Sequence, residues 1–286
     1  MTRLRWLAAV TALLVCGGMA HAQERVQFRS LDAAATRLDG YLFRAPGTGQ
    51  HPALVFLHGC GGMFNRSTGQ ISALQQDWAT ALNRDGYSVL MVDSFTPRGI
   101  ASTCAPSIYN RTVVEARPMD AYGALYYLQR QPFIRGDRIG LIGWSAGGGT
   151  VLMTIPRQST GRPAALPRGD FRAAVAFYPA RCSAQQQPAN WTSDIPLLVL
   201  VGAADVWTPA APCEAFIAGA VARGSHIELH VYPDAYHEFD APDLPVHELP
   251  RFRTSAGVVP IVGTNTTARA DALAQVPAFL ARYLGN

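Results

Sequence analysis

The sequence predicts an α/β protein with a mostly parallel central sheet and helices on both faces. Three observations support this class. Short, continuous apolar runs alternate with longer helical patterns from residue 52 onward, as expected for buried parallel strands joined by helices. The 286-residue chain is 49% hydrophobic, which is enough for a substantial core. No repeat, low-complexity tract or linker divides residues 23–286, so we expect a single domain there.

Six apolar runs are predicted to form the strands of this sheet. The first, Ala-Leu-Val-Phe-Leu at residues 53–57, is short and uninterrupted, which suits a strand buried on both faces. The others are similarly apolar and are expected at residues 87–92, 138–142, 171–177, 196–201 and 227–231.

Helical patterns fill the intervals between these strands. Residues 71–84 read as a helix that ends at an Asp-Gly pair, and residues 115–131 read as another, with Pro118 in its first turn. A third helix opens at Ser145, and a closing helix is expected over residues 268–284. Residues 240–266 are long and weakly patterned, so an active-site loop and a surface excursion both stand as interpretations.

The first 22 residues are typical of a signal peptide. A basic start is followed by an apolar run at residues 7–15 and by Ala20-His21-Ala22, the small-x-small pattern of a cleavage site. A membrane anchor is the alternative, but the run is short for a bilayer span, and no later segment is long and apolar enough to cross a membrane. A lipoprotein cleaved at Cys16 is another, although Val15 is bulkier than that cleavage usually accepts. We therefore expect export, to the periplasm or outside the cell, with cleavage after Ala22.

Charge and cysteine content narrow the function classes. Removing residues 1–22 takes away two arginines and no acid, so the net charge falls from +4 to +2. The remaining arginines are scattered, which disfavours nucleic acid as a partner. Beyond Cys16, four cysteines remain, and four cysteines allow three pairings. None has the close spacing of a zinc site, so disulfides are favoured in an oxidising compartment: Cys60, Cys104, Cys182 and Cys213.

The strongest chemical signal is Gly-Trp-Ser-Ala-Gly at residues 143–147. It follows the strand at 138–142 and precedes a helical stretch, which is the context of a nucleophile elbow. The sharp turn lifts Ser145 above the sheet, and the flanking glycines avoid collisions with neighbouring elements. A tight Gly-rich connection without chemistry is the alternative. We predict that Ser145 is a nucleophile.

A second signal is His-Gly-Cys-Gly-Gly at residues 58–62, directly after the first predicted strand. An acyl-transfer intermediate carries a negative oxygen that backbone N–H groups must meet. One donor is expected from Ala146, the residue after the nucleophile. The other is expected from Cys60, with Gly61 as its near rival. A flexible Gly-rich turn is the alternative interpretation.

The orienting acid must lie at the same carboxyl edge of the sheet as Ser145. Asp205 follows the strand at 196–201 and meets this demand. Asp194 precedes that strand and falls at its opposite end, roughly 20 Å away at about 3.3 Å per residue. Asp205 is therefore the predicted acid, with a plain turn aspartate as the alternative.

Strand position also selects the base. His237 lies just beyond the last predicted strand, whereas His226 begins that strand and His230 lies inside it. Among the other histidines, His247 lies further into the following loop and His58 belongs to the oxyanion loop. The chain order of nucleophile, acid and base is the one expected for this arrangement.

The predicted chemistry is acyl transfer through an acyl-enzyme. Ser145 would attack the acyl carbon while His237 takes its proton and Asp205 holds the imidazole in place. His237 would then protonate the leaving group and activate water. The chemistry needs no metal or organic cofactor.

Together these segments resemble the dienelactone hydrolase family of the α/β-hydrolase fold. The likeness extends from residue 52 to the closing helix and includes the motifs at 57–62, 92–99, 143–147, 177–179 and 236–240, together with the Asp205 segment. The best-known members have a cysteine nucleophile, whereas this chain has Ser145. The resemblance therefore implies the fold and the triad order but not a dienelactone substrate. It also makes Arg98 a candidate for binding a substrate carboxylate, with a structural ion pair as the equal alternative, and Trp144 is a further candidate substrate contact.

The usual strand order of this fold also implies a disulfide pairing. It places the strand before Cys60 beside the one before Cys104, and the strand before Cys182 beside the one before Cys213. The resemblance thus implies Cys60–Cys104 and Cys182–Cys213. A free Cys60 acting as nucleophile is a rival, but no activating base lies near it in the sequence.

Three functions fit these residues. The first is a serine hydrolase that cleaves small carboxylic esters or lactones. The second is an acyltransferase that uses the same acyl-enzyme with an alcohol in place of water. The third is a non-catalytic binding protein on this fold, which the complete triad and oxyanion loop disfavour. A protease would be a further possibility, but no gating domain accompanies the predicted domain.

Overall fold

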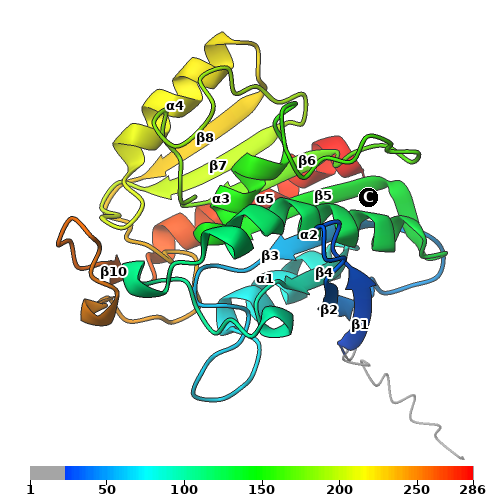
Figure 1. Ribbon diagram of the computed structural model, residues 1–286, viewed down its shortest axis with the longest axis horizontal. Helices are drawn as coiled ribbons and strands as arrows, with labels where there is room; N and C mark the ends of the chain where they lie inside the picture. Colours follow the sequence, from blue (N-terminus) through cyan, green and yellow to red (C-terminus); the bar gives the residue numbers. More distant parts are fainter. Residues whose placement is uncertain (1–22, 286) are drawn as a thin grey trace, which may run out of the picture.

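The computed structural model describes residues 23–285 and builds them around an eight-stranded sheet (Figure 1). The predicted signal peptide lies outside the described residues. The strands follow the spatial order β1-β2-β4-β3-β5-β6-β7-β8. Their bounds are β1 (Glu24–Arg29), β2 (Arg37–Phe43), β3 (His51–Leu57), β4 (Ser88–Asp93), β5 (Ile134–Trp144), β6 (Ala173–Phe177), β7 (Leu197–Gly202) and β8 (Ile227–Tyr232).

Strands β3 to β8 are all parallel to one another. Strand β2 pairs antiparallel with β4, and β1 pairs antiparallel with β2. All six predicted strands are present, with β5 longer than its apolar run suggested. The sequence analysis did not predict β1 and β2. In β1, exposed and buried positions alternate instead of forming a continuous apolar run, because this strand lies at the edge of the sheet.

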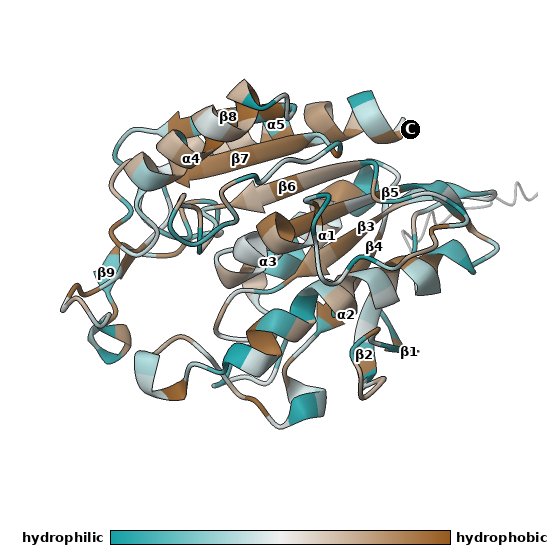
Figure 2. Cartoon of the chain, turned by 45° about the horizontal axis from the view of Figure 1, so that its top comes forward, coloured by the Kyte–Doolittle hydropathy of each residue, from teal (hydrophilic) through white to brown (hydrophobic). Residues whose placement is uncertain are grey.

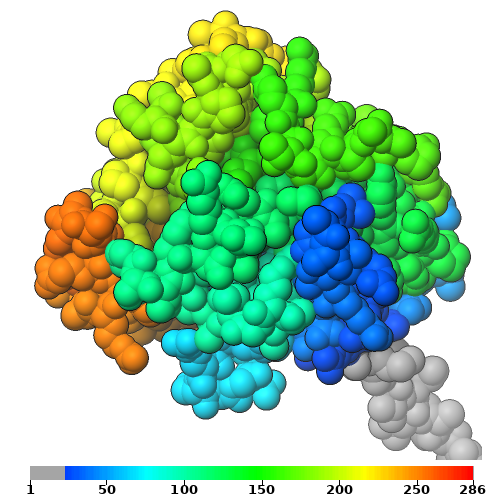
Figure 3. Space-filling view, viewed as in Figure 1, coloured from blue at the N-terminus to red at the C-terminus, as the bar shows by residue number. Residues whose placement is uncertain are grey.

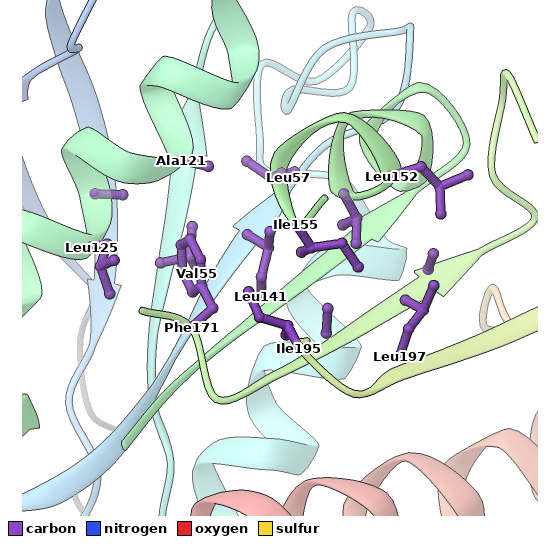
Figure 4. Packing of buried hydrophobic residues seen from close by; sticks show 14 of the residues in the cluster. Val55, Leu57, Ala121, Leu125, Leu141, Leu152, Ile155, Phe171, Ile195 and Leu197 are labelled. Atoms are coloured by element: carbon purple, nitrogen blue, oxygen red, sulfur yellow. The ribbon is translucent and has the colours of Figure 1, made fainter. Parts of the chain in front are cut away.

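Helices cover both faces of the sheet, as predicted for the fold class. Helices α2 (Arg111–Gln129), α3 (Ala146–Thr154) and α4 (Ala210–Ala222) pack on one face, and α1 (Ala73–Arg84) and α5 (Thr266–Leu284) pack on the other. Figure 4 shows side chains from the sheet meeting α2 and α3 in the first of these two apolar layers. The strands between the layers are the most hydrophobic part of the chain in Figure 2. Helix α4 was not among the predicted helices.

Helix α2 begins earlier than the sequence predicted. Asn110 caps its first turn by accepting a hydrogen bond from the Val113 N–H at 3.0 Å, so the helix starts at Arg111 instead of residue 115. Pro118 therefore lies inside the helix and not in its first turn. The proline ring packs against Gly161, where a Cβ atom would come within 2.6 Å of it.

The carboxyl ends of β3 to β8 meet along one edge of the sheet, and the loops that follow them carry the predicted chemistry. Residues 240–266 extend this edge with a second, two-stranded sheet of β9 (His247–Glu248) and β10 (Ile261–Val262). Three short 3₁₀ helices lie in the connections: Thr96–Arg98, Pro106–Ile108 and Pro250–Phe252. The candidate site lies on this edge.

Candidate active site

Ser145 occupies a sharp turn between β5 and α3. Its backbone has φ 53° and ψ −115°, a conformation that residues other than glycine rarely adopt. The turn is anchored because the Ser145 N–H donates to the Phe177 carbonyl at 3.0 Å. A Cβ atom at Gly143 would come within 2.3 Å of the Gly147 carbonyl oxygen, and one at Gly147 within 2.0 Å of the Leu57 carbonyl oxygen. Only glycines allow the strand, the turn and the helix to approach this closely.

Asp205 and His237 form a buried pair at the same edge. The Asp205 Oδ2 and His237 Nδ1 atoms are 2.7 Å apart, and the two side chains are 0% and 1% exposed. The Thr208 hydroxyl donates to the same carboxylate at 2.7 Å, and the N–H groups of Trp207 and Thr208 donate to its other oxygen. The carboxylate is held from several sides, so the imidazole orientation is set before any substrate binds.

The environment of this pair raises the pKa of His237 above the value of an isolated histidine. Burial alone would lower the pKa of His237, but the charge and hydrogen bond of Asp205 more than offset burial and raise it. For Asp205 burial opposes ionisation, and His237 together with Thr208 brings the pKa below its ordinary value. A histidine so placed accepts a proton from a nucleophile more readily.

The other imidazole nitrogen of this pair is free. Among the described residues, His237 Nε2 is buried and has no hydrogen-bond partner. His237 and Ser145 both line a cavity of about 340 Å³. The structure thus brings the predicted nucleophile and the predicted base to one cavity, with Asp205 behind the base.

The two predicted oxyanion donors meet at a second cavity. Ser145, Ala146 and Cys60 together line a space of about 500 Å³. Among the described residues, the N–H groups of Ala146 and Cys60 donate to no other protein group. These are two free backbone donors beside the nucleophile, as an oxyanion hole requires. Gly61, the rival donor, lines only the smaller cavity.

His58 supports this loop from beneath. Its ring is buried, with Nδ1 2.8 Å from the Gly59 carbonyl oxygen and Nε2 3.3 Å from the Ser94 N–H. Burial and the nearby Arg117 hold the pKa of His58 well below its ordinary value, so the ring is neutral. Both ring nitrogens of His58 already have backbone partners, so His58 anchors the loop at residues 58–62 and we keep His237 as the predicted base.

Both predicted disulfides are present. Cys60 pairs with Cys104, and Cys182 pairs with Cys213. The first bond ties the oxyanion loop to the segment after β4, where the Thr103 N–H also donates to the Cys60 carbonyl at 2.9 Å. A disulfide-bonded Cys60 has no thiol, which removes it as a rival nucleophile.

The rejected candidates lie elsewhere. Asp194 pairs with Arg157 on the surface before β7, and its side chain is 64% exposed. His230 lies within β8 beside Asp271, and His247 lies in β9, where it is exposed. His226 lies just before β8. The structure brings none of these side chains into contact with Ser145.

Arg98 requires a correction. Its guanidinium donates to both oxygens of Asp120 at 2.8–2.9 Å, to Asp32 at 2.7 Å and to the Ser94 carbonyl at 2.8 Å. It lines neither cavity at Ser145. Two carboxylates already neutralise its charge, so Arg98 forms a structural ion pair and is not placed to bind a substrate carboxylate.

Trp144 is largely a core residue. It is 2% exposed, stacks on Phe177 at 5.4 Å, and donates its indole N–H to Asp240 at 2.9 Å. Trp144 is still one of the residues that line the smaller cavity. Its contact with a substrate is therefore limited to that wall.

The sequence analysis missed the role of Asp240. This carboxylate is fully buried and accepts hydrogen bonds from the indoles of Trp78 and Trp144 and from the Tyr178 hydroxyl, at 2.7–2.9 Å. The Tyr178 ring in turn lies 4.4 Å from the His237 ring. The only signal in the sequence was an acid three residues after His237 inside the motif at 236–240.

Metal and membrane features add no further site. Within residues 23–285, no three His, Cys, Asp or Glu side chains are grouped in a way that could hold a metal ion. None of the described helices combines the length and the apolar character needed to span a bilayer.

Comparison with known proteins supports this fold assignment. A model of the dienelactone hydrolase family matches residues 38–284. No curated protein matches the sequence. Three solved structures resemble the chain over at least 91% of its length. One is a dienelactone hydrolase of Anabaena variabilis, with a TM-score of 0.59 and 17% identity, and the match covers 92% of this chain and 100% of that chain. Another is a dienelactone hydrolase-like promiscuous phosphotriesterase from metagenomic libraries, with a TM-score of 0.63 and 19% identity, covering 92% of this chain and 100% of that chain. The third is Thermogutta terrifontis esterase 2 phosphorylated by paraoxon, with a TM-score of 0.62 and 16% identity, covering 91% of this chain and 94% of that chain. At these identities the likeness establishes a shared fold, the α/β-hydrolase fold.

Proposed function

The chain belongs to the dienelactone hydrolase family, and we propose that it is a serine hydrolase that cleaves carboxylic esters or lactones through an acyl-enzyme on Ser145. One observation carries the proposal. The Asp205–His237 pair is buried and hydrogen-bonded at 2.7 Å, and it leaves Nε2 free at a cavity that Ser145 also lines. When the Ser145 hydroxyl donates to this Nε2, such a pair converts a weak serine hydroxyl into a nucleophile.

The proposed reaction has two balanced halves. Ser145 Oγ forms a bond to the acyl carbon while its proton passes to His237 Nε2, and the carbonyl oxygen becomes an anion beside the N–H groups of Cys60 and Ala146. The bond to the leaving oxygen then breaks, and that oxygen takes the proton from Nε2. Water repeats the sequence on the acyl-enzyme, releases the acid and restores Ser145.

The nucleophile limits how far the family name extends to the substrate. A serine requires a base to remove its proton in the attacking step, and the His237 pair can serve as that base. We therefore propose esters and lactones as the substrate class without assigning a dienelactone. The esterase of Thermogutta terrifontis is described as phosphorylated by paraoxon. By analogy, we expect Ser145 to react with organophosphorus probes.

A fluorophosphonate probe tests the proposal directly. The wild-type chain should be labelled covalently and should hydrolyse nitrophenyl esters, and Ser145→Ala should lose both properties. Asp194→Asn is a matched control, because it changes an exposed surface ion pair far from the site. A wild-type chain that neither labels nor turns over would refute the hydrolase. Labelling that persists in Ser145→Ala would refute the nucleophile.

The acyltransferase and the binding protein remain testable alternatives. An acyltransferase would give more transfer product than hydrolysis product when an alcohol is added to the nitrophenyl ester assay. A binding protein would retain ligand but form no covalent adduct with the probe. The free N–H groups at Cys60 and Ala146 favour a catalytic role, since a binding site has no need to stabilise an oxyanion.

Export is part of the same proposal. Two disulfides join the described residues, and such bonds persist mainly in oxidising compartments. We propose a periplasmic or secreted enzyme with a mature start near Gln23. N-terminal sequencing of the protein recovered from its native compartment tests this start.

A further inference from the structure

Ser145 lies where two cavities meet. The larger, of about 500 Å³, and the smaller, of about 340 Å³, share four lining residues: Cys60, Cys104, Ser145 and Trp207. An ester bound at Ser145 has two parts on either side of the attacked carbon, the acyl group and the alcohol group. Two cavities that meet at the nucleophile can hold these two parts separately.

The catalytic groups distinguish the two cavities. His237 lines only the smaller cavity, whereas Ala146 lines only the larger one. In the proposed reaction the leaving oxygen receives its proton from His237 Nε2, so this oxygen must come within hydrogen-bond distance of Nε2. We infer that the smaller cavity is the alcohol subsite, that it takes an uncharged apolar alcohol such as an arylmethyl alcohol, and that the larger cavity receives the acyl group. This inference rests on the proposed function.

The walls of the smaller cavity indicate the kind of alcohol. Six of its lining residues have large apolar or aromatic side chains: Phe64, Leu74, Trp207, Leu244, Leu249 and Phe252. Trp207 and Phe252 stack nearly parallel, with ring centroids 5.9 Å apart and an interplanar angle of 16°. Such a surface stabilises a flat or branched apolar group by burying its area.

Half of these six side chains come from residues 240–266, the segment whose function the sequence analysis left open. Residues 240–266 supply Leu244, Leu249 and Phe252, and part of this segment forms the protruding orange region in Figure 3. The end of this segment is hydrogen-bonded to residues 237–241, which include the predicted base His237. The Gly263 N–H donates to the His237 carbonyl at 3.0 Å, and the Thr264 hydroxyl donates to the Ala241 carbonyl at 2.6 Å. These hydrogen bonds therefore fix the cavity-lining part of residues 240–266 relative to His237, the proposed proton donor.

Charge excludes one class of alcohol. Of the described residues that line the smaller cavity, Glu238 is the only one with a carboxyl group, and no arginine faces it there. Arg181 lines the larger cavity instead. A carboxylate on the alcohol would meet Glu238 with no arginine in this cavity to balance it. The alcohol subsite should therefore prefer neutral alcohols.

Two ester series test the assignment. The alcohol series holds the acyl group constant: methyl acetate, benzyl acetate and 4-carboxybenzyl acetate. The acyl series holds the alcohol constant: methyl acetate and methyl hexanoate. For the wild type at pH 8, we expect kcat/KM to be higher for benzyl acetate than for 4-carboxybenzyl acetate, and Glu238→Gln should narrow that gap.

Phe252→Ala should lower the benzyl-to-methyl ratio of kcat/KM about tenfold, because lost apolar contacts of this size change specificity by at least that factor. Leu249→Ala is a second variant that should move the same ratio in the same direction. Val258→Ala is the matched control, since Val258 lies in the same segment but lines neither cavity. Met153→Ala, in the larger cavity, should change the hexanoate-to-acetate ratio instead.

Opposite results would overturn the assignment. If Phe252→Ala and Leu249→Ala change the acyl ratio and leave the alcohol ratio constant, the two subsites are reversed. If neither ratio moves while thermal melting shows folded variants, the segment is no subsite. If the wild type hydrolyses some of these esters but the variants give either result, the proposed function stands and this inference fails. A wild type that turns over none loses both.

Discussion

Two buried carboxylates lie near His237, the predicted base, and they differ in almost everything except burial. Asp205 is 3% exposed and Asp240 is 0% exposed. Asp205 accepts from His237, a side chain that gains and loses a proton. Asp240 accepts from two indoles and a phenol, which stay neutral donors at ordinary pH.

The partners determine the direction of each pKa shift. Burial opposes ionisation of both groups. At Asp205, the charge and hydrogen bond of His237 together with the hydrogen bonds of Thr208 overcome burial and lower the pKa, whereas at Asp240 burial dominates and raises it despite three hydrogen bonds. Burial alone therefore does not identify a catalytic acid. A partner that can gain and lose a proton, as His237 can, is the feature that marks Asp205 as the candidate.

Asp240 instead joins three parts of the fold. Trp78 belongs to α1, Trp144 ends β5 at the elbow, and Tyr178 follows β6. By accepting from all three, Asp240 holds the floor of the site together below Ser145 and His237. We therefore expect the two acids to separate in experiment, one affecting rate and the other affecting stability.

The largest expected effect is on catalysis. Asp205→Asn should lower kcat for a nitrophenyl ester by about ten-thousand-fold, because the amide no longer holds the correct imidazole tautomer. Steady-state kinetics on the purified variant measures this, with Asp194→Asn as a matched Asp-to-Asn control that should stay close to wild type. A loss below about tenfold in Asp205→Asn would show that another group orients His237.

The next effect is on folding. Asp240→Ala should lower the free energy of unfolding by about 3 kcal/mol, since it leaves three buried donors without an acceptor. Asp240→Asn should cost less, because the amide oxygen can accept from the indoles and the Tyr178 hydroxyl can accept from the amide N–H. Urea unfolding followed by tryptophan fluorescence compares the variants. Equal costs for Ala and Asn would mean that the hydrogen bonds contribute little.

The two acids should also differ in the pH dependence of the rate. His237 must be unprotonated to act as base, so kcat/KM should rise as pH increases through its pKa, which Asp205 raises above the ordinary value. In Asp205→Asn burial remains and the carboxylate charge is gone, so the midpoint should move to lower pH. In Asp240→Asn the shift should be smaller, because the effect of Asp240 on His237 is the weaker one. A pH–rate profile in which the Asp240 variant moves further would reverse the comparison.

The smallest expected effect comes from removing one donor. Tyr178→Phe keeps the ring against His237 and deletes only the hydroxyl that Asp240 accepts. We expect a loss of about 1.5 kcal/mol in the free energy of unfolding, the typical value for a hydrogen bond to a charged group, with kcat within about threefold. Should kcat collapse while stability holds, the phenol would have a role in the reaction itself.

The sequence by itself determined the six parallel strands of the sheet and predicted the order of the candidate nucleophile, acid and base. Apolar runs of five to seven residues predicted all six parallel strands, and the elbow glycines predicted the turn at Ser145. Asp205 was preferred to Asp194 because parallel strands bring their carboxyl ends to one edge. These are local patterns or consequences of strand direction, so they can be read without coordinates.

Only the tertiary structure decided which partners each polar group finds. The bonds of Arg98 to Asp32 and Asp120 span 66 and 22 residues of chain, and the bond of Trp78 to Asp240 spans 162. No periodicity encodes such distant pairs, and the same holds for the two cavities at Ser145, whose walls come from many loops. The predicted nucleophile, acid and base follow from where strands end. The hydrogen bonds of Asp240 and the proposed alcohol subsite follow from how the loops pack, which depends on the whole chain at once.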